Sequence, residues 1–141
     1  MVPHPELEEL DILAERLVTV APADTPARTW KQALTRHPFI RINRSRGAGV
    51  LIDATLRRAG IVVEEAMELD LSEAVLGMVR AGLGAGVVPA GRVAGSAGQG
   101  LTLLPFGTPP VSRRVVLVER RNNQRSDLAQ VIYRELKRLT G

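Results

Sequence analysis

Short apolar runs, bounded by proline and glycine, alternate along the chain with segments of helical periodicity. The apolar runs predict strands at 17–21, 39–42, 66–69, 85–89, 101–104 and 115–118. Helical spacing predicts helices at 30–34, 49–59 and 72–81, and one that begins at Ser126. Because most of the strands are continuous apolar runs, we predict a layered α/β fold with a largely parallel sheet.

Local signals indicate where the predicted helices begin and end. Thr29 is expected to cap the first helix, and Gly60 to follow the second as a left-handed residue. Asp70 and Glu73 have capping-box spacing for the third helix, with Ser72 as the alternative cap. In the second helix the apolar pattern directs four residues toward the core: Val50, Leu51, Ala54 and Leu56.

Residues 74–89, AVLGMVRAGLGAGVVP, hold four glycines in a stretch that is otherwise apolar except for Arg80. A dinucleotide fingerprint needs G-x-G-x-x-G between a strand and a following helix, whereas here G-x-G-x-G follows a helix and precedes a strand. A P-loop is excluded because no Gly-Lys-Ser/Thr follows. We expect Gly82 to end the helix, and Gly84 and Gly86 to allow a tight turn into a buried strand.

Composition narrows the possible chemistry. The chain has 141 residues, 45% of them hydrophobic, which supports a packed core. It has no cysteine, and His4 and His37 lie far apart, so disulfides, thiolate sites and a histidine metal site or triad are not expected. No spacing argument makes Asp53 an acid–base pair with Glu64 or Glu65, which we interpret as solvated charges. We therefore expect no enzyme, no metal and no cofactor.

The net charge of +4 and the pI near 10.6 raise the question of nucleic-acid binding. The arginines are spread along the chain with almost no aromatic residues among them to stack on bases. We interpret them as a solvated surface, with direct nucleic-acid binding as the alternative. The acidic, proline-broken start MVPHPELEELDILAE is unlike a signal peptide, and no apolar run approaches the ~20 residues that span a bilayer. We expect a cytoplasmic chain without membrane contact.

The segment LGMVRAGLGAGVVP is similar to a segment of LysR-type transcriptional regulators, in which an apolar helix precedes V-x-A-G-x-G and a short apolar strand that ends in proline. LVTVAP, HPFIRI, LRRAGI and the region from GLTLLPFG to the last helix resemble other parts of the same family in the same order. The resemblance covers about residues 10–140.

This resemblance implies the type 2 periplasmic-binding-protein-like α/β fold, in which crossover strands join two lobes. The chain would contain the end of lobe one, all of lobe two and the return crossover strands. The implied boundaries are an N-terminal arm at 1–16, lobe two at approximately 22–112, and the return crossover with a closing helix at 113–141. Together, residues 17–141 would form a partial effector-binding domain.

The function that the resemblance implies is a sensing and oligomerisation module, which binds a small, often anionic metabolite. Nothing before Leu17 resembles a helix-turn-helix, so promoter DNA would be contacted only through a part absent from this chain. In the family the helix at 49–59 belongs to a dimer face, which implies contacts by Val50, Leu51 or Asp53. Strand edges left open by an incomplete lobe one would favour pairing with a second copy or exchange of elements.

In the family, the loop after the first strand of lobe two and the starts of the following segments contact the effector. A helix N-terminus suits a carboxylate or phosphate, and Arg44 and Arg46 would add charge-assisted bonds. The alternatives are that both arginines point into water and that Ser72 only caps its helix. The candidate effector-binding residues are Asn43, Arg44, Ser45, Arg46, Gly47, Ala48 and Ser72.

Three other functions remain open from the sequence. The chain could be a stand-alone regulatory or oligomerisation protein. A transport-type solute-binding protein would need an export signal, and an enzyme on a two-lobe fold would need convergent acid–base or phosphate-binding groups. Neither feature is identified in this sequence.

Overall fold

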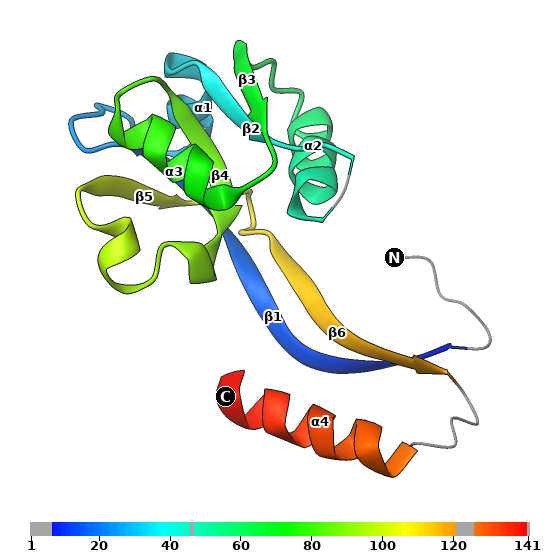
Figure 1. The fold of residues 1–141 in the computed structure, drawn as a ribbon. Helices are drawn as coiled ribbons and strands as arrows, with labels where there is room; N and C mark the ends of the chain where they lie inside the picture. The colour runs from blue at the N-terminus through cyan, green and yellow to red at the C-terminus, as the bar shows by residue number, and fades with distance from the viewer. Residues whose placement is uncertain (1–6, 46, 121–125, 141) are drawn as a thin grey trace. The chain divides into compact units, whose positions relative to one another are not determined.

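The computed structural model describes residues 7–45, 47–120 and 126–140. One compact unit consists of residues 16–113, and the second of the described residues before and after that range. The elements, shown in Figure 1, are β1 (Leu7–Pro22), α1 (Trp30–Arg36), β2 (Phe39–Ile42), α2 (Ala48–Arg58), β3 (Glu65–Leu69), α3 (Ser72–Arg80), β4 (Ala85–Pro89), the 3₁₀ turns η1 (Ala90–Arg92) and η2 (Gly95–Gly98), β5 (Leu101–Pro105), β6 (Ser112–Arg120) and α4 (Ser126–Thr140).

The sheet is mixed, with the order β3-β2-β4-β1-β5, and β6 pairs with β1. β2 is parallel to β3 and to β4, whereas β1 is antiparallel to β4 and to β5. The prediction of a largely parallel sheet therefore holds for β3, β2 and β4 and is wrong for β1. The parallel strands are the ones joined through α2 and α3, since parallel neighbours need a crossover connection.

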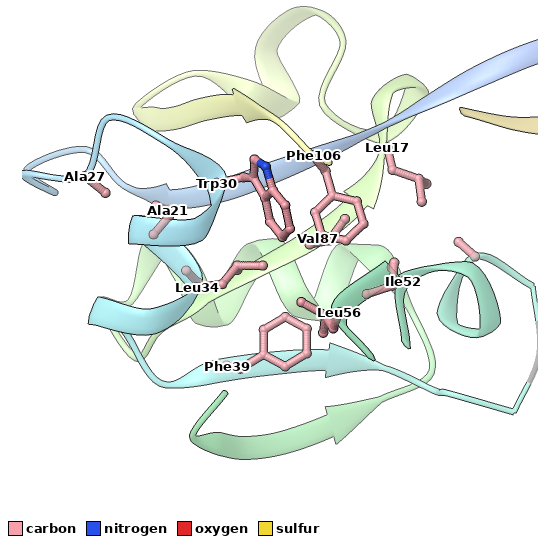
Figure 2. Close-up of a cluster of buried hydrophobic side chains, with 13 residues drawn as sticks. Leu17, Ala21, Ala27, Trp30, Leu34, Phe39, Ile52, Leu56, Val87 and Phe106 are labelled. Carbon is pink, nitrogen blue, oxygen red and sulfur yellow. The ribbon is translucent and has the colours of Figure 1, made fainter. Parts of the chain in front are cut away.

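Helices α2 and α3 cover opposite faces of this sheet (Figure 1), and each face has its own core. On the α2 face, Trp30 packs edge-on against Phe106 at a centroid distance of 5.1 Å, above Phe39 and Val87 (Figure 2). On the α3 face, Val88 packs with Val75 and other aliphatic side chains. Because adjacent residues of a strand point to opposite faces, a strand covered on both sides is a continuous apolar run.

Helix α2 buries a different set of residues from the one that the apolar pattern predicts. Its buried positions are Ala48, Gly49, Ile52, Thr55 and Leu56. Leu56 was expected to face inward and does, and Leu51 is half-buried against the core. Val50, with an exposed fraction of 49%, and Ala54 face solvent, so these two predictions are wrong. Ile52 was missed although it is apolar, and Thr55 was missed because it is polar; both lie on the buried stripe with Ala48 and Leu56.

The glycine stretch forms the predicted helix, turn and strand. Gly82 has a φ of +78° just after the C-cap of α3. A Cβ at Gly86 would lie 2.8 Å from the carbonyl oxygen of Ile40 and 2.8 Å from a methyl carbon of Val75. A Cβ at Gly84 would overlap the carbonyl oxygen of Pro38. Both glycines therefore let β4 lie close to β2, and Gly86 also lets α3 pack on β4.

A buried guanidinium joins β2, α2 and β3. Arg41, which is 5% exposed, donates to Asp53 at 3.0 Å and to Glu65 at 3.2 Å, and it lies over the ring of Phe39. Arg57 also pairs with Asp53 at 2.9 Å. The interpretation of Asp53 and Glu65 as solvated charges is therefore wrong, because both pair with Arg41. Their pairing with Arg41 satisfies a charge that would be costly to bury alone.

The smaller unit contains the outer part of β1, most of β6 and α4. Strand β1 begins at Leu7 and not near Leu17. The sequence did not predict this early start, because residues 7–16, LEELDILAER, mix charged and apolar side chains without a long apolar run or a regular alternation. Within this unit Arg114 pairs with Asp11, and the Tyr133 hydroxyl donates to the Asp11 carbonyl at 2.8 Å. None of the described helices is long and apolar enough to cross a membrane.

Candidate functional site

A cavity of about 350 Å³ opens at the carboxyl ends of β2 and β4. Helix α2 follows β2 on one face of the sheet, and α3 precedes β4 on the other. In open α/β sheets such a crevice, at the point where the connections diverge to opposite faces, is the preferred ligand site. Its lining residues are Ile42, Asn43, Gly47, Ala48, Asp70, Leu71, Ser72, Glu73, Pro89, Arg92 and Arg113.

The starts of α2 and α3 both contribute to this lining. The N-cap residue of α2 is Gly47, with a φ of +58°, and that of α3 is Leu71, which is extended. Neither residue has a side chain that can cap its helix by a hydrogen bond. The predicted capping by Asp70 or Ser72 is therefore wrong, because Leu71 occupies the N-cap position. First-turn N–H groups and the positive ends of two helix dipoles are thus left for a ligand or solvent.

Asn43 organises the loops on either side of the cavity. Its Nδ2 donates to Asp70 at 2.9 Å, and its Oδ1 accepts from the backbone N–H and the hydroxyl of Ser45, at 3.0 and 2.6 Å. A Cβ at Gly49 would overlap the carbonyl oxygen of Asn43, so α2 begins directly against the end of β2. Asn43 therefore acts on the shape of the site as well as lining it.

Arg44 does not line the cavity. Its backbone N–H and its Nε both lie 3.1 Å from Glu68 Oε2, and its guanidinium also pairs with Glu65. Hydrogen bonds to Glu68 and then to Glu65 raise the pKa of Arg44. The backbone N–H of Arg44, followed by its side chain, lowers the pKa of Glu68. Arg46 lies outside the described residues.

Of the seven predicted site residues, the structure brings Asn43, Gly47, Ala48 and Ser72 together at the cavity. Ser45 lies next to it as a partner of Asn43. The sequence did not identify Arg92, which ends η1, or Arg113, which stands near the start of β6. The available signal for Arg92 was its place three residues after Pro89, just beyond the carboxyl end of a predicted buried strand.

The charges around the cavity are balanced. Arg92 and Arg113 contribute two positive charges, and Asp70 and Glu73 contribute two negative ones. Such a lining offers donors for an anionic group together with acceptors for hydroxyl or amine groups. Among the described residues no group of three or more His, Asp or Glu side chains is arranged to hold a metal ion.

The chain matches proteins of known family. The family model for the LysR substrate binding domain matches residues 2–140. The HTH-type transcriptional regulator YfeR of Shigella flexneri is 31% identical over 102 residues, which are 72% of this chain and 33% of that protein. The chain therefore spans about a third of the length of this curated relative.

Solved structures share the fold. The regulatory domain of CcmR from Synechocystis PCC6803 has a TM-score of 0.82 at 24% identity, covering 99% of this chain and 70% of that one. The effector binding domain of QuiR has a TM-score of 0.69 at 20% identity, covering 84% and 58%, respectively. The LysR family regulator CbnR has a TM-score of 0.74 at 20% identity, covering 96% and 48%. The predicted periplasmic-binding-protein-like fold is thus confirmed, and with a family model that matches nearly the whole chain, this protein belongs to the LysR substrate-binding domain family.

Proposed function

We propose that this chain is the effector-sensing part of a LysR-type transcriptional regulator and that its effector binds in the cavity at the ends of β2 and β4. The observation that carries this proposal is the convergence of two helix starts and Arg92 on that cavity. In support, similar structures hold small molecules, 2-PG in the CcmR regulatory domain and shikimate in the QuiR effector binding domain.

The effector is a small polar metabolite with an anionic group. A carboxylate or phosphate would accept hydrogen bonds from the first-turn N–H groups of α2 and α3 and from Arg92. Asp70 and Glu73 disfavour a ligand that is anionic throughout, so hydroxyl or amine donors on its other side complete the match. Ser72, at the first position of α3, contributes a hydroxyl to this set.

The chain acts by binding rather than by catalysis and works in the cytoplasm, in line with its family. Residues 2–140 match a substrate-binding domain, so promoter DNA would be contacted through a separate helix-turn-helix. Self-association belongs to the same proposal. The dimer contact at Val50 has support from its exposure on α2, whereas Asp53 is engaged by Arg41 and Arg57.

The proposal is tested by a thermal-shift and calorimetric screen of small carboxylates and phosphates, with and without hydroxyl groups. For a compound that binds the wild type, Arg92→Gln and Ser72→Ala should each weaken binding by about tenfold, the loss of one hydrogen bond to a charged group. Both side chains lie at the cavity and neither caps a helix, so the unliganded variants should keep the wild-type melting temperature.

Arg44→Ala is the matched comparison, because Arg44 belongs to the same loop but is paired with Glu65 and Glu68. It should lower the stability slightly and leave the affinity unchanged. If binding is insensitive to Arg92→Gln and Ser72→Ala but is lost in Arg44→Ala, the compound binds near Arg44 and not in the cavity. Absence of any binding compound in the screen would count against a sensing role.

A further inference from the structure

A second cavity, of about 430 Å³, lies between α1, the end of α2 and the turn that leads into β6. Its lining residues are Trp30, Lys31, Thr55, Arg58, Ala59, Thr108, Pro109, Pro110, Val111 and Ser112. None of these residues lines the cavity at the ends of β2 and β4. Helix α2 begins at one cavity and ends at the other, and its 11 residues separate them by about 16 Å at the usual rise per residue.

The charge of this second cavity is one-sided. Lys31 and Arg58 both line it, and no acidic residue is among the lining. Within the described part of the chain neither cation forms an ion pair. The Lys31 ammonium instead lies 5.7 Å from the centre of the Trp30 ring. Two cations that share a cavity repel each other, and an anion between them would remove that repulsion.

Part of the lining of this cavity is apolar and held in place by the core. Trp30 is 6% exposed and packs edge-on against Phe106, which is fully buried (Figure 2). The indole N–H of Trp30 donates to the Thr108 hydroxyl at 3.0 Å. That hydroxyl accepts one bond and keeps its proton to donate to a ligand. Pro109, Pro110 and Val111 add an apolar wall with little freedom to rearrange.

From this arrangement we propose that the cavity is a second ligand site, which takes a small organic carboxylate with an apolar body. The carboxylate lies between Lys31 and Arg58 and accepts a hydrogen bond from Thr108, while the apolar body lies against Pro109, Pro110 and the edge of Trp30. Ligands of this kind are recognised by a largely apolar site with a few placed polar groups. The site is independent of the effector cavity.

The chain has one tryptophan, and it lines this cavity, so the tryptophan signal comes from a residue of the proposed site. We would titrate the protein with phenylacetate and follow the single indole N–H resonance and the tryptophan fluorescence. A saturable shift is expected with phenylacetate, and little or none with phenylacetamide, which has the same body without the charge. The double variant Lys31→Gln/Arg58→Gln should weaken the phenylacetate response at least about tenfold, since it removes two charged hydrogen-bond donors.

Arg92→Gln is the control, because it removes a cation from the effector cavity and leaves this one intact. It should not change the indole titration, so failure of the effector proposal and failure of this one are distinguishable. Three results would overturn the second site: no saturable indole shift, an equal response to the neutral amide, or a response unchanged in the double variant. An equal shift with inorganic phosphate would contradict the role of the apolar body.

Discussion

Among single residues, Gly49 lies beside the candidate site, where the first turn of α2 meets the end of β2. A Cβ at this position would overlap the backbone carbonyl of Asn43, which cannot move without displacing both elements. We expect Gly49→Ala to destabilise the protein by at least about 2 kcal/mol in chemical denaturation, as overpacking against a backbone does.

Gly77→Ala is the matched control for this substitution. Gly77 lies inside α3, and a Cβ there would meet nothing within 4 Å. This change should stabilise the protein by about 0.5–1 kcal/mol, because alanine loses less backbone entropy in a helix. Two Gly→Ala variants with the same sign of effect would show that the contact at Asn43 is not what requires glycine.

Thr19 is the buried polar residue whose hydroxyl finds no partner among the described residues. It lies in β1 between Val87 of β4 and Leu104 of β5, and it is 0% exposed. Thr19→Val keeps the shape and removes a desolvated hydroxyl, so we expect stabilisation by about 1 kcal/mol. Thr55→Val, at a hydroxyl that donates to the Leu51 carbonyl at 2.8 Å, should bring no such gain. A loss of stability in Thr19→Val would indicate a hydrogen bond that this geometry does not contain.

At the scale of elements, the loop after β2 is attached to β3 through Arg44 and Glu68. The folded chain lowers the pKa of Glu68 below its ordinary value of 4.5, chiefly through the backbone N–H of Arg44. The stabilisation from this carboxylate is therefore complete above that ordinary value and is lost as the pH falls through the lowered pKa. We expect Glu68→Gln to reduce the slope of stability against pH below about pH 4.5, measured by denaturation at several pH values.

Glu64→Gln serves as the comparison, because Glu64 is exposed next to the same strand and its side chain forms no ion pair with the described residues. It should leave the acid-side slope close to that of the wild type. Since Glu68 is at the surface, the effect should also weaken in high salt. An unchanged slope in Glu68→Gln at low salt would show that the Arg44 contact contributes nothing to the attachment of the loop.

The sequence predicted most elements of the larger unit because their signals are local. β2 was predicted at 39–42 and occupies Phe39–Ile42, and Thr29 caps α1 by accepting a bond from Gln32, as expected. The two helix starts that line the cavity at the ends of β2 and β4 were also close, since α2 and α3 begin at Ala48 and Ser72. What the sequence missed depends on tertiary contacts. The pairing of Arg44 with Glu65 and Glu68 joins residues more than 20 positions apart.

At the scale of the whole molecule, the order of the segments led to the right fold although the sheet direction was partly wrong. The glycine stretch carried the family resemblance, and in the fold Gly86 lets β4 lie close to β2 and to α3. Arg92 could not be assigned in the same way. It follows the end of β4 by three residues, but its loop, GRVAGSAGQG, carries no motif that marks Arg92 as part of a ligand site.

The fold leaves an apolar face on α4 that we expect a second copy of the chain to cover. One stripe of this helix holds four large apolar side chains that are 45–71% exposed: Leu128, Val131, Ile132 and Leu139. The surface of a monomeric soluble protein seldom gathers so many large apolar side chains. Light scattering should therefore give a mass above the 15.3 kDa of a single chain. Val131→Glu/Ile132→Glu should weaken the association at least about tenfold, because it places charge in an apolar contact. Gln130→Glu, which adds charge at an exposed position of the same helix, should leave it nearly unchanged. A monodisperse monomer over a wide range of protein concentration would contradict this expectation.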